Sequence, residues 1–403
     1  MDKSIPYIPP ISRYTRQVSY EDWFLSTEYF EKKDYYNSFK YLLKYINAPI
    51  DIPDSDTLDL TVPQGSVYLR VKADKEKYSF SIPFLKFTKD SNRIAAMRRM
   101  IEQNFSSLIL SQIVLREDEL YFHYEDNIYN AEPYKIYFTL DEMSTEADNT
   151  DDYYIDRFNL EHIIKPDLDY FTSEEYEKSK ELFYTILNDS IAGSEYFEGK
   201  RNYNSACDYL ALCLFKIKYV IFPQGILGRE IQEILNYMYS NEGVNTILNN
   251  TRLKIKKLIE IEESKFKDSL FHPKFFIPIK PRLDLIKLQE ILKPIQEKTQ
   301  EIIGNKAYQE SGIYILYNLY YILDGYSINS HLQDSIEHAL SDVSQKDWKF
   351  TSDYLLKLIN NIMIIKLDEE GNITSGTLDI FETSKEKKSK MNSIFSKIRN
   401  IFK

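Results

Sequence analysis

The chain has 403 residues, with 51 Lys and Arg against 62 Asp and Glu, which gives a formal net charge of −11 at pH 7. This length allows two or three domains that each bury a core. The acidic balance argues against nucleic acid as a partner, because a nucleic-acid binder needs a basic face that neutralises phosphates.

Residues 1–18 are rich in proline and are expected to run extended over the surface. They lack the apolar run of a signal peptide, and no stretch of the sequence is long and apolar enough to span a bilayer. The two cysteines, Cys207 and Cys213, are too few for a disulfide framework and are not spaced as zinc ligands. The sequence therefore predicts a cytoplasmic protein.

Residues 20–49 and 195–222 share a pattern that resembles one tetratricopeptide repeat. Each has an aromatic pair, a short turn and then a small residue, Ser38 in the first and Ala206 in the second, which would let two antiparallel helices approach closely. The two hairpins either pack separately, each on its own domain, or form a groove for a partner protein. Under the second hypothesis four tyrosines are candidate partner-binding residues: Tyr35, Tyr41, Tyr203 and Tyr209.

Residues 65–158 form the one part of the chain that has the pattern of a compact α/β domain, preceded by a helical hairpin and linker at 19–64. Apolar and polar residues alternate over Gly65–Lys72 and again over Tyr78–Ile82, as in half-buried strands. A helix is expected at Asn92–Phe105, followed by a second hairpin. The natural way to bury these patterns is an antiparallel sheet with helices on one face.

The expected helix at Asn92–Phe105 carries one apolar stripe, and we expect this stripe to cover the sheet. Its members recur at helical spacing: Ile94, Met97, Ile101 and Phe105. Three basic residues are expected to face water: Arg93, Arg98 and Arg99.

The order of these elements resembles the type III secretion chaperone family of the Tir-chaperone type. The similar segments are the strands and helix just named, the hairpin at Leu108–Tyr124 and the stretch Leu140–Phe158, together about a quarter of the chain. The resemblance implies an acidic, usually dimeric domain without enzymatic activity. It also implies that an extended segment of a partner protein lies along the sheet and helices.

Tyr134–Leu140 is either a further strand or the start of a closing helix. The following stretch, Asp141–Asp156, carries many carboxylates. Calcium binding is one interpretation, because hard cations prefer carboxylate ligands. However, the stretch lacks the ligand spacing and the turn glycine of an EF-hand loop, so we expect a solvated acidic linker.

Residues 172–363 show a succession of helical patterns, which predicts a mainly α-helical domain and an α+β fold for the whole chain. Tyr308–Leu323 is apolar nearly all round, as in a buried central helix. The prolines of Phe271–Arg282 interrupt the helical pattern. This segment is expected to be an extended strap between helical subdomains, or else to dock a partner through Phe275 and Phe276.

No catalytic, cofactor-binding or metal site is predicted. Pro223–Arg229 is the best candidate for a phosphate-binding loop, but it lacks the Lys-Ser/Thr ending and is expected to be a break between helices. His331 and His338 share a predicted helix face with Asp334. With no fourth ligand in view, we expect them to be ordinary surface residues.

A hairpin is predicted at 364–383 and a basic amphipathic tail at 384–403. The tail combines an apolar stripe with basic residues: Met391, Ile394, Phe395, Lys397, Ile398, Arg399, Ile401, Phe402 and Lys403. Such a helix can bind an anionic membrane surface or a partner's groove, which would make the protein peripheral to the membrane in the first case. It can equally pack back onto the chain's own helices.

Together these features favour a non-enzymatic adaptor or chaperone-like protein that holds segments of a protein partner, without a cofactor. The resemblance also raises the possibility of a homodimer. Two alternatives remain. One is a structural component that its basic tail recruits to a membrane or a partner, and the other is an enzyme whose site is assembled from scattered residues.

Overall fold

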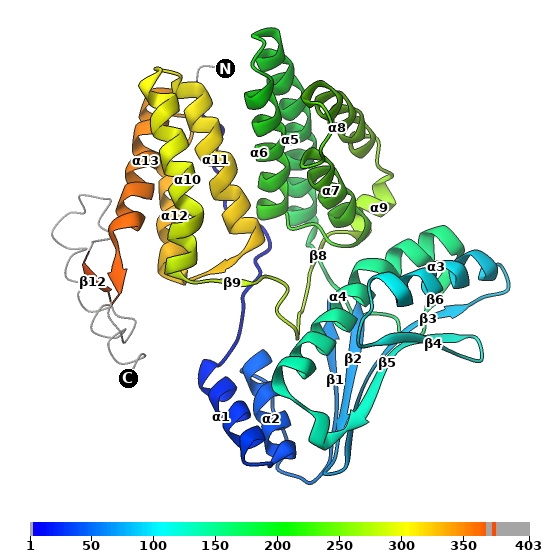
Figure 1. Cartoon of the computed structure of the whole chain (residues 1–403). Helices are drawn as coiled ribbons and strands as arrows, with labels where there is room; N and C mark the ends of the chain where they lie inside the picture. Colours follow the sequence, from blue (N-terminus) through cyan, green and yellow to red (C-terminus); the bar gives the residue numbers. More distant parts are fainter. Residues whose placement is uncertain (1–2, 368–372, 376–403) are drawn as a thin grey trace.

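The structure is a computed structural model, which describes residues 3–367 and 373–375. The described chain consists of an α/β domain and a larger helical domain, joined by extended segments (Figure 1). The predicted α+β fold class, with a small antiparallel sheet and a larger helical part, is confirmed.

An antiparallel sheet forms the centre of the α/β domain. Its strands are β1 (Leu58–Gln64), β2 (Val67–Ala73), β3 (Lys77–Phe87), β4 (Gln112–Arg116), β5 (Glu119–Asn127) and the short β6 (Leu160–His162). The spatial order is β1-β2-β3-β5-β4, with β6 paired to the end of β3, so β1 and β4 lie at the two edges. Phe80 lies opposite Val71 on one side and Tyr124 on the other, which places large side chains together across the strands.

Four helices belong to this domain. They are α1 (Tyr20–Glu31), α2 (Tyr35–Ile46), α3 (Arg93–Ser106) and the long α4 (Pro133–Phe158). α4 contacts β2, β3, β5 and β6, and α2 and α3 pack beside it. The ring of Phe39 from α2 stacks on Phe80 with 6.0 Å between centroids, so helices and sheet share one core.

Two boundaries in this domain differ from the sequence-based expectation. The expected domain at 65–158 begins earlier, because β1 lies within the stretch assigned to a hairpin and linker, and α1 and α2 belong to the same core. The Asp141–Asp156 stretch is not a solvated linker. It is the C-terminal part of α4, which begins at Pro133 and so also settles Tyr134–Leu140 as helix.

The expected covering face of α3 is wrong for three of its four residues. Met97 packs against the core as expected, whereas Ile94, Ile101 and Phe105 are exposed. The buried positions of the helix are Ala96, Met100 and Gln103. Because the apolar stripe does not cover the sheet, the resemblance to the secretion chaperones loses the support that this helix was expected to give. The antiparallel pairing of the strands agrees with the expectation.

The helical domain contains two helical groups that meet along α6 and α11. Its helices are α5 (Ser173–Gly199), α6 (Tyr203–Val220), α7 (Gly225–Met238), α8 (Val244–Ile259), α9 (Glu263–Asp268), α10 (Leu285–Gly304), α11 (Tyr308–Gly325), α12 (Ser330–Asp342) and α13 (Trp348–Ile364). Most residues of α11 are buried, as expected for a central helix. Short strand pairs accompany these helices: β7 (Asp169–Tyr170) with β8 (Phe271–His272), β9 (Arg282–Leu283) with β10 (Ser327–Ile328), and β11 (Lys366–Leu367) with β12 (Ile373–Ser375).

Both predicted helical hairpins are present, as α1–α2 and α5–α6. The small residues lie at the helix contacts, since Ser26 Oγ donates to the backbone oxygen of Ser38 at 2.9 Å and Ala206 is fully buried. The antiparallel pairing of β11 with β12 agrees with the hairpin expected from 364 onward, as far as 375.

Two extended segments, 3–19 and 273–281, run between the domains (Figure 1). The first was expected to run over the surface, but Ser4 and Ser12 are buried. The backbone of Lys3 also forms an isolated antiparallel β-bridge with that of Asp347. The second links the α/β domain with the helical domain, because Phe276 and Ile277 belong to the core of the sheet.

Candidate binding surface

The exposed apolar stripe of α3 and the loop after it form a surface that we call the α3 surface. It consists of Ile94, Ile101, Phe105, Ile109 and Leu110. The side chains of Phe105 and Ile109 are 87% and 88% exposed, and that of Ile94 is 70% exposed. Single exposed apolar residues are ordinary, but several on one helix face and the adjoining loop, here with the exposed Arg98 among them, are typical of an interaction site.

The loop of this surface is held in place by α4. The carboxylate of Glu142 accepts from the backbone N–H of Ile109 at 2.6 Å and from that of Ser111 at 2.9 Å. The hydroxyl of Ser111 donates to the same carboxylate at 2.6 Å. Because the loop backbone is fixed, Ile109 and Leu110 are presented to solvent at little entropic cost to a partner. The sequence analysis missed this role, because Glu142 was assigned to a solvated linker.

Part of the neighbouring sheet edge, β4, is already hydrogen-bonded to a side chain of α3. Asn104 of α3 donates from Nδ2 to the backbone oxygen of Ile113 at 3.0 Å, and the N–H of Ile113 donates to Asn104 Oδ1 at 2.7 Å. A side chain that occupies both backbone groups prevents another strand from pairing there. A partner of the α3 surface is therefore held by apolar contacts more than by addition of a strand.

A hollow lies between the two extended segments and the other sheet edge, β1. Its volume is about 450 Å³, and Tyr14, Val62 and Phe275 are among the residues that line it. The strap already pairs with the end of β1 here, since Phe276 N donates to the backbone oxygen of Pro63 at 3.2 Å and Gly65 N donates to that of Lys274 at 2.9 Å. The chain's own segments thus occupy much of this edge.

The aromatic residues proposed to bind a partner make contacts within the chain. Phe276 is buried, and the Phe275 ring lies edge-on to Tyr14 with centroids 6.0 Å apart. Tyr41 stacks on Tyr29 at 5.1 Å, and Tyr35 meets Phe30 edge-on.

The four hairpin tyrosines are not brought together. Tyr35 and Tyr41 lie in the α/β domain, whereas Tyr203 and the buried Tyr209 lie in the helical domain. The two hairpins therefore do not form a common groove. The tail residues Met391–Lys403 lie outside the described residues.

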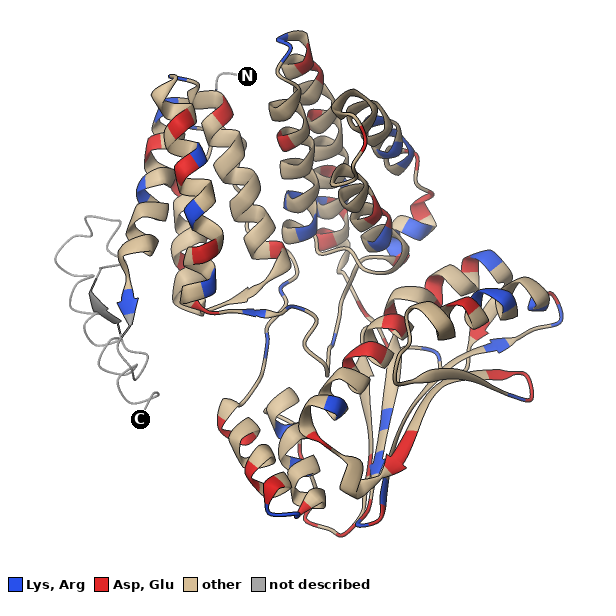
Figure 2. Cartoon of the chain, in the orientation of Figure 1, with Lys and Arg blue, Asp and Glu red and all other residues tan. Residues whose placement is uncertain are grey.

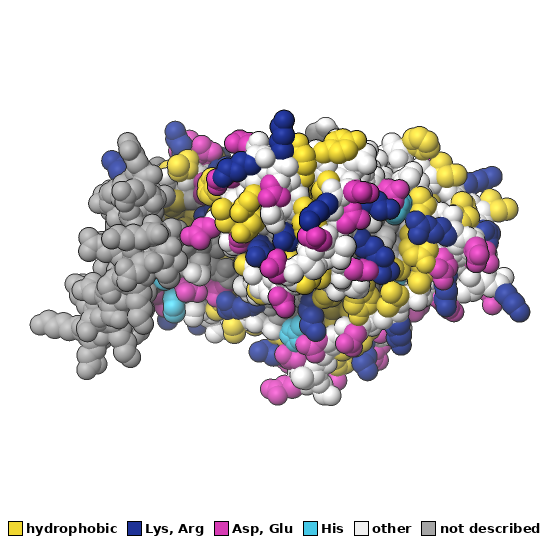
Figure 3. All heavy atoms as spheres, turned by 90° about the horizontal axis from the view of Figure 1, so that it is seen from below, with side chains coloured by type: hydrophobic (Ala, Val, Ile, Leu, Met, Phe, Trp, Pro, Cys, Tyr) yellow, Lys and Arg dark blue, Asp and Glu magenta, His cyan; other side chains and the backbone are white. Residues whose placement is uncertain are grey.

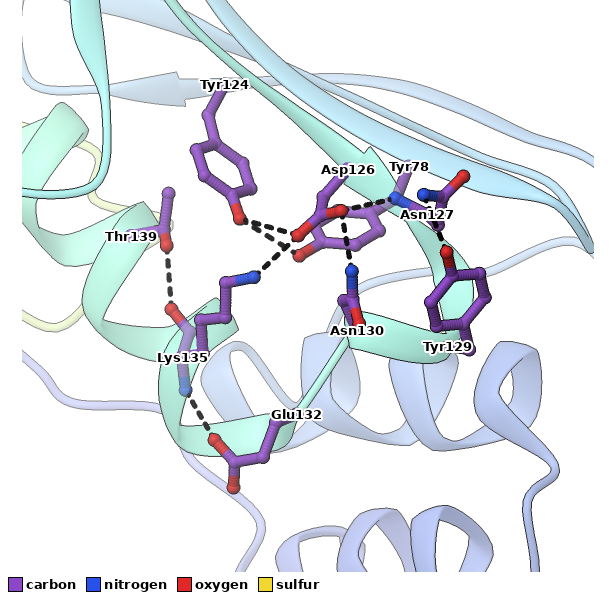
Figure 4. Close-up of polar contacts among 9 residues, drawn as sticks. All are labelled: Tyr78, Tyr124, Asp126, Asn127, Tyr129, Asn130, Glu132, Lys135 and Thr139. Atoms are coloured by element: carbon purple, nitrogen blue, oxygen red, sulfur yellow. Dashed lines mark hydrogen bonds and ion pairs between the residues drawn. The ribbon is translucent and has the colours of Figure 1, made fainter.

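A polar cluster closes the corner between β5, the short helix Ile128–Asn130 and α4 (Figure 4). Asp126 pairs with Lys135 at 2.6 Å, and it accepts hydrogen bonds from Asn130 and Tyr124 at 2.9 and 3.2 Å. Burial alone would raise the pKa of Asp126, but the hydrogen bonds from Lys135, Asn130 and the backbone N–H of Asn127, with the Lys135 charge, lower it to about 2. A carboxylate that is fully ionised and fully bonded holds structure together and has no free oxygen for catalysis.

Within residues 3–367 and 373–375, no group of three or more His, Cys, Asp or Glu is arranged to hold a metal ion. His331, Asp334 and His338 of α12 are exposed. No helix in that part of the chain is long and apolar enough to cross a membrane. On the face seen from below, basic and acidic side chains alternate with hydrophobic ones and form no large field of one sign (Figure 3).

A scan against protein-family models and a search of the curated proteins give no match to this chain.

Proposed function

We propose that this chain is a non-enzymatic adaptor or chaperone-like protein that holds a segment of a partner protein on the α3 surface. The observation that supports this proposal is the exposure of Ile94, Ile101 and Phe105 on one face of α3, next to Ile109. Burying one side chain of this size stabilises a complex by about 1.5–3 kcal/mol. Several such side chains on a pre-fixed surface offer a partner apolar area to bury, against which the cost of association must be set.

The chemistry around the stripe defines the partner segment. Since Asn104 blocks the adjacent strand edge, the segment is expected to present an apolar face, as an amphipathic helix does. Arg93 is paired with Asp118 and Arg99 with Glu102, so the rim carries both signs of charge. Such a rim sets orientation and contributes little to affinity.

The test is affinity capture from the native cell with the wild-type chain and with the double variant Ile101→Asp/Phe105→Asp. The matched control is Ile286→Asp/Phe350→Asp, which changes two exposed apolar residues of the helical domain. We expect the amount of one co-purifying protein to fall by more than about tenfold with the α3 variant, a loss that corresponds to about 1.4 kcal/mol of binding free energy. The control variant should retain this protein.

Both variants change exposed side chains, so their unfolding midpoints are expected to match that of the wild type. A partner that the α3 variant retains, or that both variants lose equally, would contradict the proposal. Sedimentation of the same proteins shows whether the partner is a second copy of this chain. In that case the wild type and the control sediment as dimers, and the α3 variant alone sediments as a monomer.

A further inference from the structure

A second group of exposed apolar side chains lies on α1 and on the N-terminal part of α4. We call it the aromatic surface, and it consists of four residues: Tyr20, Phe24, Tyr134 and Phe138. Phe24 is 69% exposed and Phe138 is 58% exposed. Large aromatic groups exposed on two neighbouring helices are typical of an interaction site.

Ring contacts connect α1, α2 and α4 at this surface. The half-buried Trp23 of α1 lies 4.7 Å from Tyr134 of α4, measured between ring centroids. Tyr45 of α2 lies 5.0 Å from Trp23 and 6.1 Å from Tyr137, whose ring lies 6.0 Å from that of Phe138. These contacts hold the rings in place, so a helix that docks on them orders few further side chains.

The charge beside Phe24 is negative. α1 carries four acidic residues and no basic one (Figure 2). Glu21 and Glu28 lie one turn before and one turn after Phe24, so their side chains flank this ring on the helix surface. Lys32, just after the helix, pairs with Glu28, but an exposed pair of this kind is weak. A docking helix therefore meets acidic groups on both sides of Phe24.

α4 adds to this negative charge. Asp141 is half-buried and lies one turn after Phe138. Lys135 lies on the same part of α4, but its ammonium group is paired with Asp126 of β5 at 2.6 Å. Lys135 is therefore not available to neutralise the acids of the aromatic surface.

The chain contains a segment of complementary chemistry in its own C-terminal tail, residues 384–403. The tail carries seven Lys or Arg and one Glu, and its sequence predicts a helix with one apolar stripe. An apolar stripe flanked by basic residues is complementary to aromatic rings flanked by acids. The α3 surface fits the tail less well, because α3 itself carries three arginines and one glutamate.

The end of α13 and the aromatic surface both lie near the start of α10. Gln289 Nε2 of α10 donates to the backbone oxygen of Ile365, just after α13, at 2.8 Å. Seven residues before Gln289, the guanidinium of Arg282 lies 4.1 Å from the ring centroid of Tyr20. The C-terminal end of the described helices is therefore close to one end of the aromatic surface.

We propose that the tail, residues 384–403, docks on the aromatic surface of its own chain as an amphipathic helix. Its apolar stripe contacts Phe24 and Phe138, and its basic residues lie beside the acids of α1. Sixteen residues separate Ser375, the end of β12, from Met391, where the stripe begins. A segment of this length spans at most about 50 Å, which allows the tail to reach α1 past the start of α10.

The test is photo-cross-linking within the full chain, with benzoylphenylalanine in place of Phe395 on the apolar stripe. We expect mass spectrometry of the digested protein to locate the product on α1 or on the N-terminal part of α4. The same probe in place of Asn400, opposite the stripe, should give little product there. Products confined to other helices, α3 included, would overturn the proposal. So would a product of twice the chain's mass, because the tail would then dock on a second copy.

The contribution of the rings is tested with Phe24→Ala/Phe138→Ala, which should lower the yield on α1 and α4 several-fold. Ile286→Ala/Phe350→Ala is the matched control, since it removes two exposed apolar side chains of the helical domain. The control should keep the wild-type yield. All four side chains are exposed, so the unfolding midpoints are expected to stay the same. An unchanged yield in the first variant, or an equal loss in both, would overturn the proposal.

The contribution of the charges is tested with Glu21→Lys/Glu28→Lys, which places like charges opposite the tail and should also lower the yield several-fold. Glu290→Lys/Glu297→Lys makes the same change at the same spacing on exposed positions of α10 and should have no effect. The wild-type yield should fall between about 0.1 M and 1 M salt, as the screening length shortens from about 10 Å to 3 Å. A yield that responds to neither charge reversal nor salt would contradict recognition by charge.

Discussion

Single residues decide the contacts between distant segments in this molecule. Asn92 caps α3 by accepting from the N–H of Ala95 at 3.3 Å, and a residue of this type just before a helix is a local sequence signal for such a cap. The role of Asp148 was not predictable in this way, because its partner Ser66 lies 82 residues away. A local pattern indicates a cap, but it does not show which carboxylate a folded chain buries.

Two glycines at positive φ, each against a carboxylate of α4, give a prediction at this scale: Gly65 lies against Asp148 and Gly225 against Asp152. Gly65→Ala and Gly225→Ala place a methyl group at positive φ and into a carboxylate, so each is expected to lower the free energy of unfolding by at least about 1–2 kcal/mol. Gly199→Ala is the control, since a Cβ there meets nothing within 4 Å. Urea unfolding measures the difference. Equal midpoints for Gly65→Ala and Gly199→Ala would mean that the turn is not fixed by Asp148.

The cluster around Asp126 gives a second prediction. Asp126→Ala removes the ion pair with Lys135 and the bond from Asn130 and should cost roughly 1–2 kcal/mol at pH 7. Since the folded-state pKa of Asp126 is lowered to about 2, its contribution is present above the unfolded value and is lost as the pH falls toward 2. Unfolding at pH 7 and pH 2.5 measures it. A difference between wild type and variant that does not shrink at the lower pH would contradict the assignment.

At the scale of elements, periodicity identified the helices but not what each helix faces. The stripe of α3 has the spacing of a core face, yet Gln103 takes a core position. It does so because Gln103 Nε2 donates to Glu146 at 2.8 Å and Tyr154 donates to Gln103 Oε1 at 2.8 Å. Because α4 satisfies this polar residue, Gln103 can take a core position, and Ile94, Ile101 and Phe105 of the apolar stripe are left to solvent. The acidic part of α4 was mistaken for a linker for the same reason, since its carboxylates find distant partners.

The α5–α6 hairpin was predicted from its small residue, and this can be tested directly. Ala206 is fully buried, so Ala206→Leu should overpack the helix contact and lower the free energy of unfolding by about 1–3 kcal/mol. Ala192→Leu on α5 makes the same change at an exposed position and should have little effect. Thermal or urea unfolding compares the two. Equal stability of both variants would show that the helices do not approach at Ala206.

At the scale of the whole molecule, the N-terminal segment holds the domains together more than its proline-rich sequence indicated. Lys216 of α6 is almost fully buried and donates to the backbone oxygen of Pro6. Ile11 N donates to the backbone oxygen of Val220 at 2.7 Å, and Arg13 pairs with Glu337 of α12 at 2.9 Å. One extended segment therefore contacts both helical groups before the chain enters the α/β domain.

This arrangement predicts a large effect from a small N-terminal change. Replacing residues 3–12 by a Gly/Ser-rich segment of equal length preserves the chain connection but removes the apolar contacts of Ile5, Tyr7 and Ile8 with the helical core. We expect the free energy of unfolding to fall by about 2–4 kcal/mol. Amides at the ends of α6 and α12 should exchange faster, because a segment without these apolar contacts no longer holds its backbone against Lys216 or Ser4 against the backbone oxygen of Val343. The single variant Lys3→Ala, at an exposed position, serves as the control and should be near neutral. If the replaced segment leaves both stability and exchange unchanged, the segment only lies on the surface, as its composition first suggested.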